Sequence, residues 1–227
     1  MRNWLNALCL YLLCLSAWAD EPALQRLEAN MGPGCHIAIS FPAKLKASLS
    51  GSPKVGIPGD PNAGGGGFTV WQPLPKSWHT SLEDLYFGLL CQDLSLKRPS
   101  ERVRFNSATG QWEKNLAYFA KMFDYGDPSD EEDRREYSAA HRVTNFTAVN
   151  AAGYILTEDD IWGMDPEWRQ RHLSFCLLHP PKVLCGGGVV ANLKELPRGD
   201  LMPHVLDILR NIEFLPDVPT DQPPSQP

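Results

Sequence analysis

The stretch that decides the fold is RHLSFCLLHPPKVLCGGGVVANL, residues 171–193. Its first eight residues predict a strand, residues 179–182 predict a turn around two prolines, and residues 183–193 predict the returning strand. Two such runs on either side of a short turn form an antiparallel hairpin. The three successive glycines in the second strand, Gly186 to Gly188, indicate a β-bulge.

Two further strands precede this hairpin, and a helix follows it. Residues 143–149 and 154–157 are predicted strands on either side of a turn at 150–153. Together with the hairpin they form an antiparallel meander of four strands. Pro203 suits the first turn of a helix that we expect to run through about residue 210.

The N-terminal half is patterned less clearly. Its predicted elements are helices at 20–31 and 81–91, strands at 35–41 and 68–71, a long glycine-rich loop at 42–67, and a segment at 112–123 that fits a helix. The helix at 81–91 depends on a capping box, Thr80 with Glu83, that is followed by leucines at helical spacing. The first residues of the 112–123 segment also fit the second strand of a hairpin.

These elements predict an α+β fold, in which helices pack on an antiparallel sheet. We expect a single domain over residues 20–214, or two subdomains that meet near residue 128. Residues 215–227 contain five prolines and no apolar periodicity, so they are predicted to form a disordered tail.

Residues 1–19 match a cleavable signal peptide. Arg2 gives a basic start, residues 5–15 are almost wholly apolar, and Ala17-Trp18-Ala19 supplies the small residues that flank a cleavage site. The apolar run is shorter than the roughly 20 residues that a membrane-spanning helix needs, and no later segment is apolar enough to span a bilayer. We therefore predict a periplasmic protein without a membrane span.

Four cysteines follow the signal peptide: Cys35, Cys91, Cys176 and Cys185. An even number of cysteines in an exported chain predicts disulfides, whereas a zinc site would need cysteines in close pairs. If the hairpin turn is centred between its two prolines, Cys176 faces Cys185 across the strands, at a distance that a disulfide can span. We predict the pairs Cys176–Cys185 and Cys35–Cys91. A shift of one residue in register would instead link the hairpin cysteines to Cys35 or Cys91.

No motif indicates an enzyme. The chain has no G-x-S-x-G, no H-E-x-x-H and no dinucleotide-binding glycine motif, and its six histidines have no recognised catalytic or ligand spacing. The glycine run at 64–67 lacks the lysine and the hydroxyl residue of a phosphate-binding loop. We expect no catalytic residue, metal or cofactor, although residues distant in sequence can still converge into a site.

The charge and two tryptophans point to a protein partner. The formal net charge is −6, which disfavours nucleic acids and anionic membranes as partners. Acids gather at the start of a predicted helix, where they favour the helix dipole or face a basic protein. Exposed tryptophans anchor interfaces, although core packing is their commoner role. The predicted partner-binding residues are Asp130, Glu131, Glu132, Asp133, Trp162 and Trp168.

The C-terminal third also carries a family resemblance. The residues that carry it are Gly153-Tyr154, the hairpin segments 171–176 and 184–186, and the closing segment 208–214. This order of meander, helix and short apolar ending resembles the C-terminal part of periplasmic immunity proteins that protect Gram-negative bacteria from type VI secretion toxins. The resemblance implies a non-enzymatic protein that binds a toxin, and it supplies no individual binding residue.

The leading functional prediction is therefore an exported protein-binding module whose partner is a basic toxin. An envelope hydrolase without a recognisable motif and a structural envelope factor are the alternatives.

Overall fold

The fold is mostly β, and the α+β prediction is wrong. The computed structural model describes residues 23–55, 60–71, 73–96, 100–122, 129–162 and 165–217, without the side chains of residues 129 and 130. These residues form twelve strands and three short α-helices. The predicted signal peptide at 1–19 lies outside the described residues.

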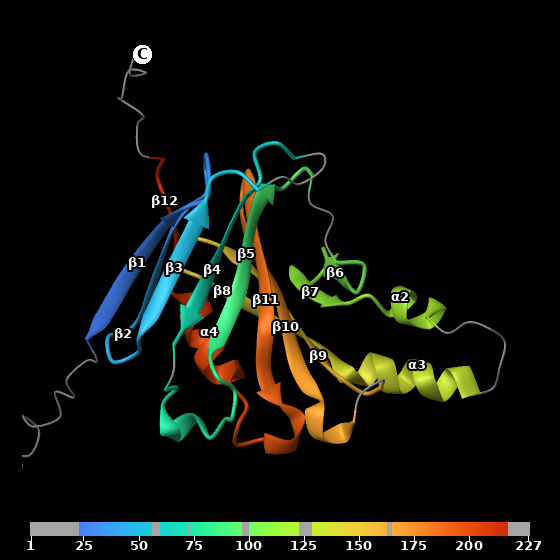
Figure 1. Ribbon diagram of the computed structural model, residues 1–227. Helices are drawn as coiled ribbons and strands as arrows, with labels where there is room; N and C mark the ends of the chain where they lie inside the picture. Colours follow the sequence, from blue (N-terminus) through green and yellow to red (C-terminus); the bar gives the residue numbers. More distant parts are fainter. Residues whose placement is uncertain are drawn as a thin grey trace, which may run out of the picture.

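One large antiparallel sheet organises the molecule (Figure 1). Its seven strands lie in the order β3-β4-β5-β11-β10-β9-β8. Their bounds are β3 Ala47–Ser52, β4 Gly64–Val70, β5 Leu85–Asp93, β8 His141–Thr147, β9 Ala152–Asp159, β10 Gln170–His179 and β11 Lys182–Asn192. A second sheet of three strands has the order β1-β2-β12, from β1 Leu24–Asn30, β2 His36–Pro42 and β12 Ile212–Leu215.

The C-terminal meander is confirmed. Strands β8 to β11 pair in sequence, and the register places His179 opposite Lys182 and Cys176 opposite Cys185. The helix α4 Met202–Arg210 follows as expected. The bulge lies in β11 but not at its glycines: Arg171 pairs with Ala191 and His172 with Val189, so Val190 is the extra residue.

Two predicted helices are strands. The segment at 81–91 becomes β5 because Leu85, Phe87, Leu89 and Cys91 alternate onto one face, where each is no more than 5% exposed. The period of two therefore prevails over the capping box once neighbouring strands are present. Of the segment at 20–31, residues 24–30 form β1, which pairs along its whole length with β2.

The predicted loop at 42–67 also contains paired structure. Strand β3 lies inside it, and β4 begins within the glycine run at Gly64. A Cβ atom at Gly64 would lie 1.6 Å from the carbonyl oxygen of Met31, so no larger residue fits there. The expected flexible loop is therefore partly a strand whose glycine permits a close approach of two backbones.

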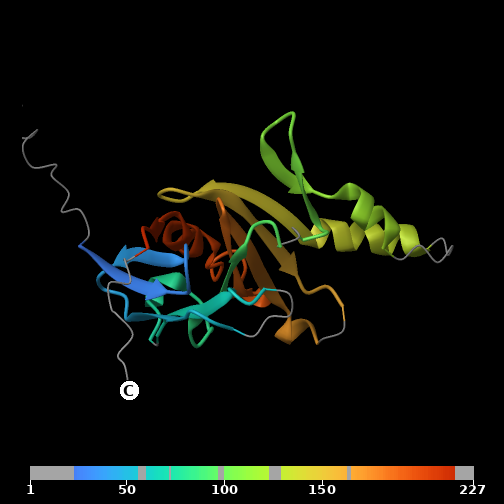
Figure 2. The same ribbon diagram turned by 90° about the horizontal axis from the view of Figure 1, so that it is seen from above.

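The inner face of the large sheet is closed. It carries Phe68, Phe87 and Phe175, each no more than 1% exposed, and it packs against the three-stranded sheet and α4. Figure 2 shows α4 between the two sheets, and α4 contacts both β2 and β11. This layer contains the main hydrophobic core.

The outer face, which carries Tyr154, Cys176 and Cys185, is covered only in part. Its cover comes from a projecting arm that consists of the hairpin β6 Val103–Asn106 and β7 Gln111–Lys114, with α2 Leu116–Lys121 and α3 Ser129–Ala140. Figure 2 shows these elements together on one side of the large sheet. The segment predicted as a helix at 112–123 is thus β7 followed by α2.

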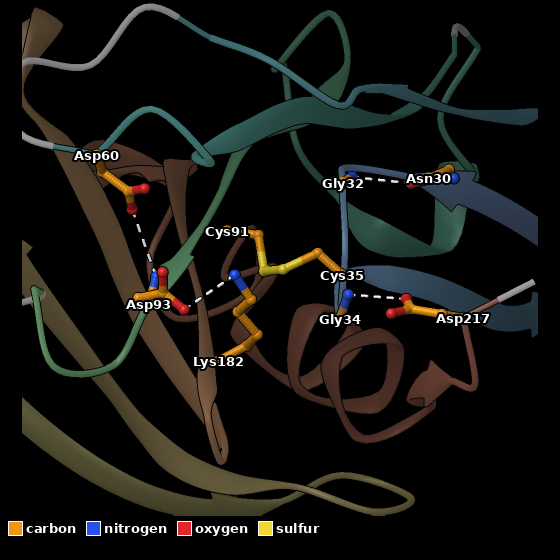
Figure 3. Close-up of a disulfide and its surroundings, with 9 residues drawn as sticks. All are labelled: Asn30, Gly32, Gly34, Cys35, Asp60, Cys91, Asp93, Lys182 and Asp217. Carbon is orange, nitrogen blue, oxygen red and sulfur yellow. Dashed lines mark hydrogen bonds and ion pairs between the residues drawn. A yellow bond between two sulfur atoms is a disulfide. The ribbon is translucent and has the colours of Figure 1, made fainter. Parts of the chain in front are cut away.

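The two disulfides join the predicted cysteine pairs. Cys35 binds Cys91 in the inner core, and Cys176 binds Cys185 on the outer face. Around the first disulfide, the Nζ atom of Lys182 lies 3.0 Å from a carboxylate oxygen of Asp93 (Figure 3). Disulfides are typical of oxidising compartments, which agrees with export of the chain.

The predicted tail begins too early at residue 215. Leu215 is the last residue of β12, and the carboxylate of Asp217 accepts a hydrogen bond of 2.7 Å from the backbone N–H of Gly34 (Figure 3). Residues 218–227 lie outside the described residues.

Candidate partner-binding face

The side chain of Asn145 fastens the hairpin of the arm to the edge of the large sheet. The Oδ1 atom of Asn145 in β8 accepts a hydrogen bond of 2.7 Å from the N–H of Trp112, and its Nδ2 atom donates one of 2.8 Å to the Trp112 carbonyl. An asparagine amide can serve as both donor and acceptor, so it takes the place of the backbone N–H and C=O of a partner residue in a neighbouring strand. The position of β7 relative to β8 therefore depends on Asn145.

Three aromatic rings continue from this point across the outer face. The Trp112 ring lies 4.8 Å from the Tyr154 ring and 5.3 Å from the Phe105 ring, measured between centroids. Tyr154 is 2% exposed, whereas Phe105 is 53% exposed. Burial raises the pKa of Tyr154 above its ordinary value. The row of rings thus leads from the small buried cluster on the outer face, around Tyr154, to the surface.

An apolar cavity lies beside these rings, and we name it the hairpin hollow. Its volume is about 530 Å³, within the range of cavities that take small ligands or side chains. It is lined by Phe105, Gly110, Gln111, Trp112, Asn145, Phe146, Thr147, Ala152, Gly153 and Leu178. Leu116, which is 60% exposed, extends the apolar surface along the arm.

A second cavity of about 460 Å³ lies farther along the outer face. Cys176 and Cys185, each 8% exposed, line it together with Leu90, Tyr154 and Ser174. The outer disulfide therefore borders open space, whereas Cys35 and Cys91 are no more than 2% exposed.

All four predicted acids lie on α3, at the far end of the arm. Glu131 and Glu132 are exposed, and Asp133 is half-buried. The Glu132 carboxylate lies 3.8 Å from the guanidinium of Arg135. Asp130 belongs to α3, but its side chain lies outside the described part of the chain. These acids share α3 with Arg134 and Arg135, so the helix carries charges of both signs with an excess of negative charge.

The two predicted tryptophans lie in different places. Trp162 is 41% exposed and stacks on Tyr137 of α3 at 5.7 Å between centroids, so it joins the arm. Trp168 is 65% exposed in the short helix η2 Pro166–Trp168, where the Nζ atom of Lys194 lies 5.6 Å from its ring centroid. The structure brings only Trp162 together with the acids of α3.

A buried polar cluster anchors α3 to the sheet. His141, whose side chain is fully buried, lies between Arg102 and Glu158, and these two residues form an ion pair. The pKa of Glu158 is lower than usual, mainly through a hydrogen bond that His141 donates to it when Nε2 carries a proton; burial opposes this shift, and the charge of Arg102 assists it.

Sequence reasoning missed the residues of the hairpin hollow. Phe105 and Trp112 face each other in the β6–β7 register. The hairpin alternative for the 112–123 segment was the signal that could have found this pair. Asn145 gave no comparable signal, because its role depends on a contact between strands.

The described residues also bear on metal binding and on membrane crossing. Within the part of the chain that the structure describes, no three His, Cys, Asp or Glu side chains gather as a metal site would require. No helix among the same residues is long and apolar enough to cross a membrane.

Comparisons with known proteins show no family. No family model matches the sequence, and no curated protein matches it. Among solved structures, the solution structure of cyanobacterial PsbP (CyanoP) from Synechocystis sp. PCC 6803 matches with a TM-score of 0.39 and 11% sequence identity. The match covers 87% of this chain and 96% of that one. A likeness at this level carries no argument for fold or function.

Proposed function

We propose that the protein is an exported binding module that holds a protein partner against its outer face. The observation that carries this proposal is the hairpin hollow, which is lined by the half-exposed ring of Phe105. Leu116, in α2 of the same arm, adds a further exposed apolar side chain. Apolar surface grouped around a cavity marks an interaction site more often than scattered apolar residues do. Aromatic residues in such a setting supply much of the binding energy of protein interfaces.

Charge suggests the nature of the partner. The chain has a net charge of −6, and α3 places Glu131 and Glu132 on the same arm as the hollow. Opposite charge on a partner speeds association and orients it. We therefore propose a basic protein that inserts an apolar side chain into the hollow. The family resemblance of the C-terminal third further supports the proposal of a periplasmic location and a secreted toxin as partner.

The test is capture of a partner by variants that remove apolar surface from the arm. The bait is the protein exported and purified with its disulfides, and captured proteins from envelope extract and from toxin-producing neighbours are identified and then titrated. We expect Phe105→Ser with Leu116→Ser to weaken the affinity for the captured partner at least about tenfold, or 1.4 kcal/mol.

Matched controls come from the opposite side of the molecule. Trp71 is 51% exposed and Leu24 is 59% exposed, close to the values for Phe105 and Leu116. Trp71→Ser with Leu24→Ser should leave the affinity unchanged. Equal loss in both double variants would show that the arm is not the binding surface. Turnover of an envelope substrate by the purified protein, with no captured partner, would favour the hydrolase alternative.

A further inference from the structure

The connection between α3 and β8 contains a fully buried titratable group, His141. His141 follows Ala140, the last residue of α3, with no linker, and is itself the first residue of β8. Its imidazole is fully buried and packs against the rings of Phe119, at 5.1 Å, and Tyr137, at 4.5 Å between centroids. Histidine is the side chain that ordinarily changes charge between pH 5 and 8.

One nitrogen of this imidazole has the same role in both charge states. The Nδ1 atom lies 2.7 Å from the carbonyl oxygen of Tyr137. That carbonyl is one of the last four of α3, which have no partner within the helix. A carbonyl only accepts, so Nδ1 must donate, and the neutral ring keeps its proton there. The lone pair of the neutral ring therefore lies on Nε2.

The other nitrogen lies between two groups of opposite charge. Nε2 of His141 is 3.3 Å from Nη1 of Arg102 and 3.4 Å from Oε1 of Glu158. A neutral Nε2 accepts a hydrogen bond from Arg102 and repels the carboxylate. A protonated Nε2 donates to Glu158 and repels the guanidinium. The two charge states thus favour different partners.

We propose that His141 is a proton-operated switch that exchanges Arg102 for Glu158 as its partner and thereby alters how the hairpin of the arm is held. Protonation strengthens the bond between the connection and β9, and it places a positive charge at the C-terminus of α3, where the helix dipole favours it. Protonation also removes one of the contacts that hold Arg102, whose side chain is 31% exposed and can turn toward water.

The backbone of Arg102 transmits this change to the hairpin. Its carbonyl accepts a hydrogen bond of 2.9 Å from Asn115, the residue between β7 and α2, and its N–H donates to the hydroxyl of Ser100 at 3.3 Å. Arg102 also immediately precedes β6. A change at its side chain therefore reaches the strands that wall the hairpin hollow.

Other charged and titratable groups surround the switch from every packed element. They are Arg102 before β6, Lys114 of β7, Tyr118 of α2, Tyr137 of α3 and Glu158 of β9, with His172 of β10 directly opposite Glu158. Among the residues that the structure describes, Glu158 is the anion and Arg102 the cation that lie within reach of Nε2. These two residues therefore control the pH at which the switch operates.

The test is an NMR titration of the ¹⁵N-labelled, disulfide-bonded protein between pH 8 and 5. We expect the ring nitrogens of His141 and the backbone amides of residues 102–104 and 137–141 to move together through one transition. Amides of β3, at the opposite edge of the large sheet from β8, should not follow it. Separate transitions for the ring and the hairpin, or a ring that keeps one charge state over the whole range, would overturn the proposal.

Two variants that leave His141 in place sharpen the test. Glu158→Gln keeps the shape of the side chain and should move the transition by about one unit to lower pH, and Arg102→Gln should move it by a similar amount to higher pH. His172→Gln, which removes the histidine on the other side of Glu158, should leave the transition where it is. A response to His172→Gln as large as that to Glu158→Gln would show that the wrong histidine has been assigned. No partner is needed for this experiment, so its result is separate from that of the binding test.

Discussion

The two faces of the large sheet are closed to different degrees. The inner face is sealed by the three-stranded sheet and α4, and its phenylalanines are almost completely buried. The outer face has a small core around Tyr154 and the outer disulfide, with a projecting arm that leaves two cavities beside it. The same strands therefore serve stability with one surface and leave the other available for binding.

Two asparagines repeat this contrast on a smaller scale. Asn145 binds the N–H and carbonyl of Trp112, and Asn150 binds the N–H and carbonyl of Phe214 in the same manner. The first fastens the arm, whereas the second fastens β12 of the inner layer. Identical chemistry is thus used once on each side of the sheet, which provides matched experiments.

The largest expected effect is loss of a ring from the inner core. Phe87→Ala should lower the free energy of unfolding by about 3–5 kcal/mol, because it removes a fully buried ring and leaves a cavity. Phe105→Ala on the outer face should change it by no more than about 0.5 kcal/mol, because that ring is 53% exposed. Urea unfolding measures both values. Similar losses for the two variants would contradict the division between the faces.

Loss of the inner disulfide should lower stability more than loss of the outer disulfide. Cys35 and Cys91 are 56 residues apart in sequence, and Cys176 and Cys185 are 9 apart. On the chain-entropy model, Cys35→Ser with Cys91→Ser should cost about 4 kcal/mol, and Cys176→Ser with Cys185→Ser about 2.7 kcal/mol. Thermal unfolding of the two double variants tests the order. A larger loss at the outer pair would mean that local packing, rather than loop length, governs stability.

Replacing each of the two asparagines tests the same contrast between the closed inner layer and the arm. Asn150→Ala should lower global stability by about 1–2 kcal/mol, because β12 is part of the closed layer. Asn145→Ala should instead speed hydrogen exchange in β6 and β7, while the global free energy of unfolding falls by less than about 1 kcal/mol. Hydrogen exchange read residue by residue separates the two cases. Equal global losses would show that the arm folds as one unit with the core.

The smallest expected effect is a pH dependence at α4. Burial lowers the pKa of His204, which stacks on Trp78 at 4.4 Å between ring centroids, below its ordinary value. The unfolded chain then binds the proton more tightly, so stability falls as pH drops below about 6.5. His204→Phe should remove that part of the slope in unfolding measured between pH 8 and 5. An unchanged slope would assign the pH dependence to other groups.

The sequence predicted local strands better than their long-range partners. The two strand-forming runs on either side of Pro180 and Pro181 were sufficient to predict the C-terminal hairpin and its disulfide, because a short turn sets the register. β5 was missed because Leu82, Leu85 and Leu89 also fit a helix, and only neighbouring strands decide between the two periods. The hairpin hollow was missed for a related reason, because it depends on Asn145 meeting a strand that lies 33 residues away in sequence.

The fastening of the arm by Asn145 has a consequence for how the protein can be produced. Asn145-Phe146-Thr147 is an N-glycosylation sequon. Both of its bonds to Trp112 leave from one edge of the amide, where the oxygen and one N–H lie side by side. A sugar on Nδ2 of a trans amide occupies that edge. A eukaryotic secretory host that glycosylates Asn145 would therefore yield a protein with a detached hairpin, whereas a bacterial host would leave the hairpin in place.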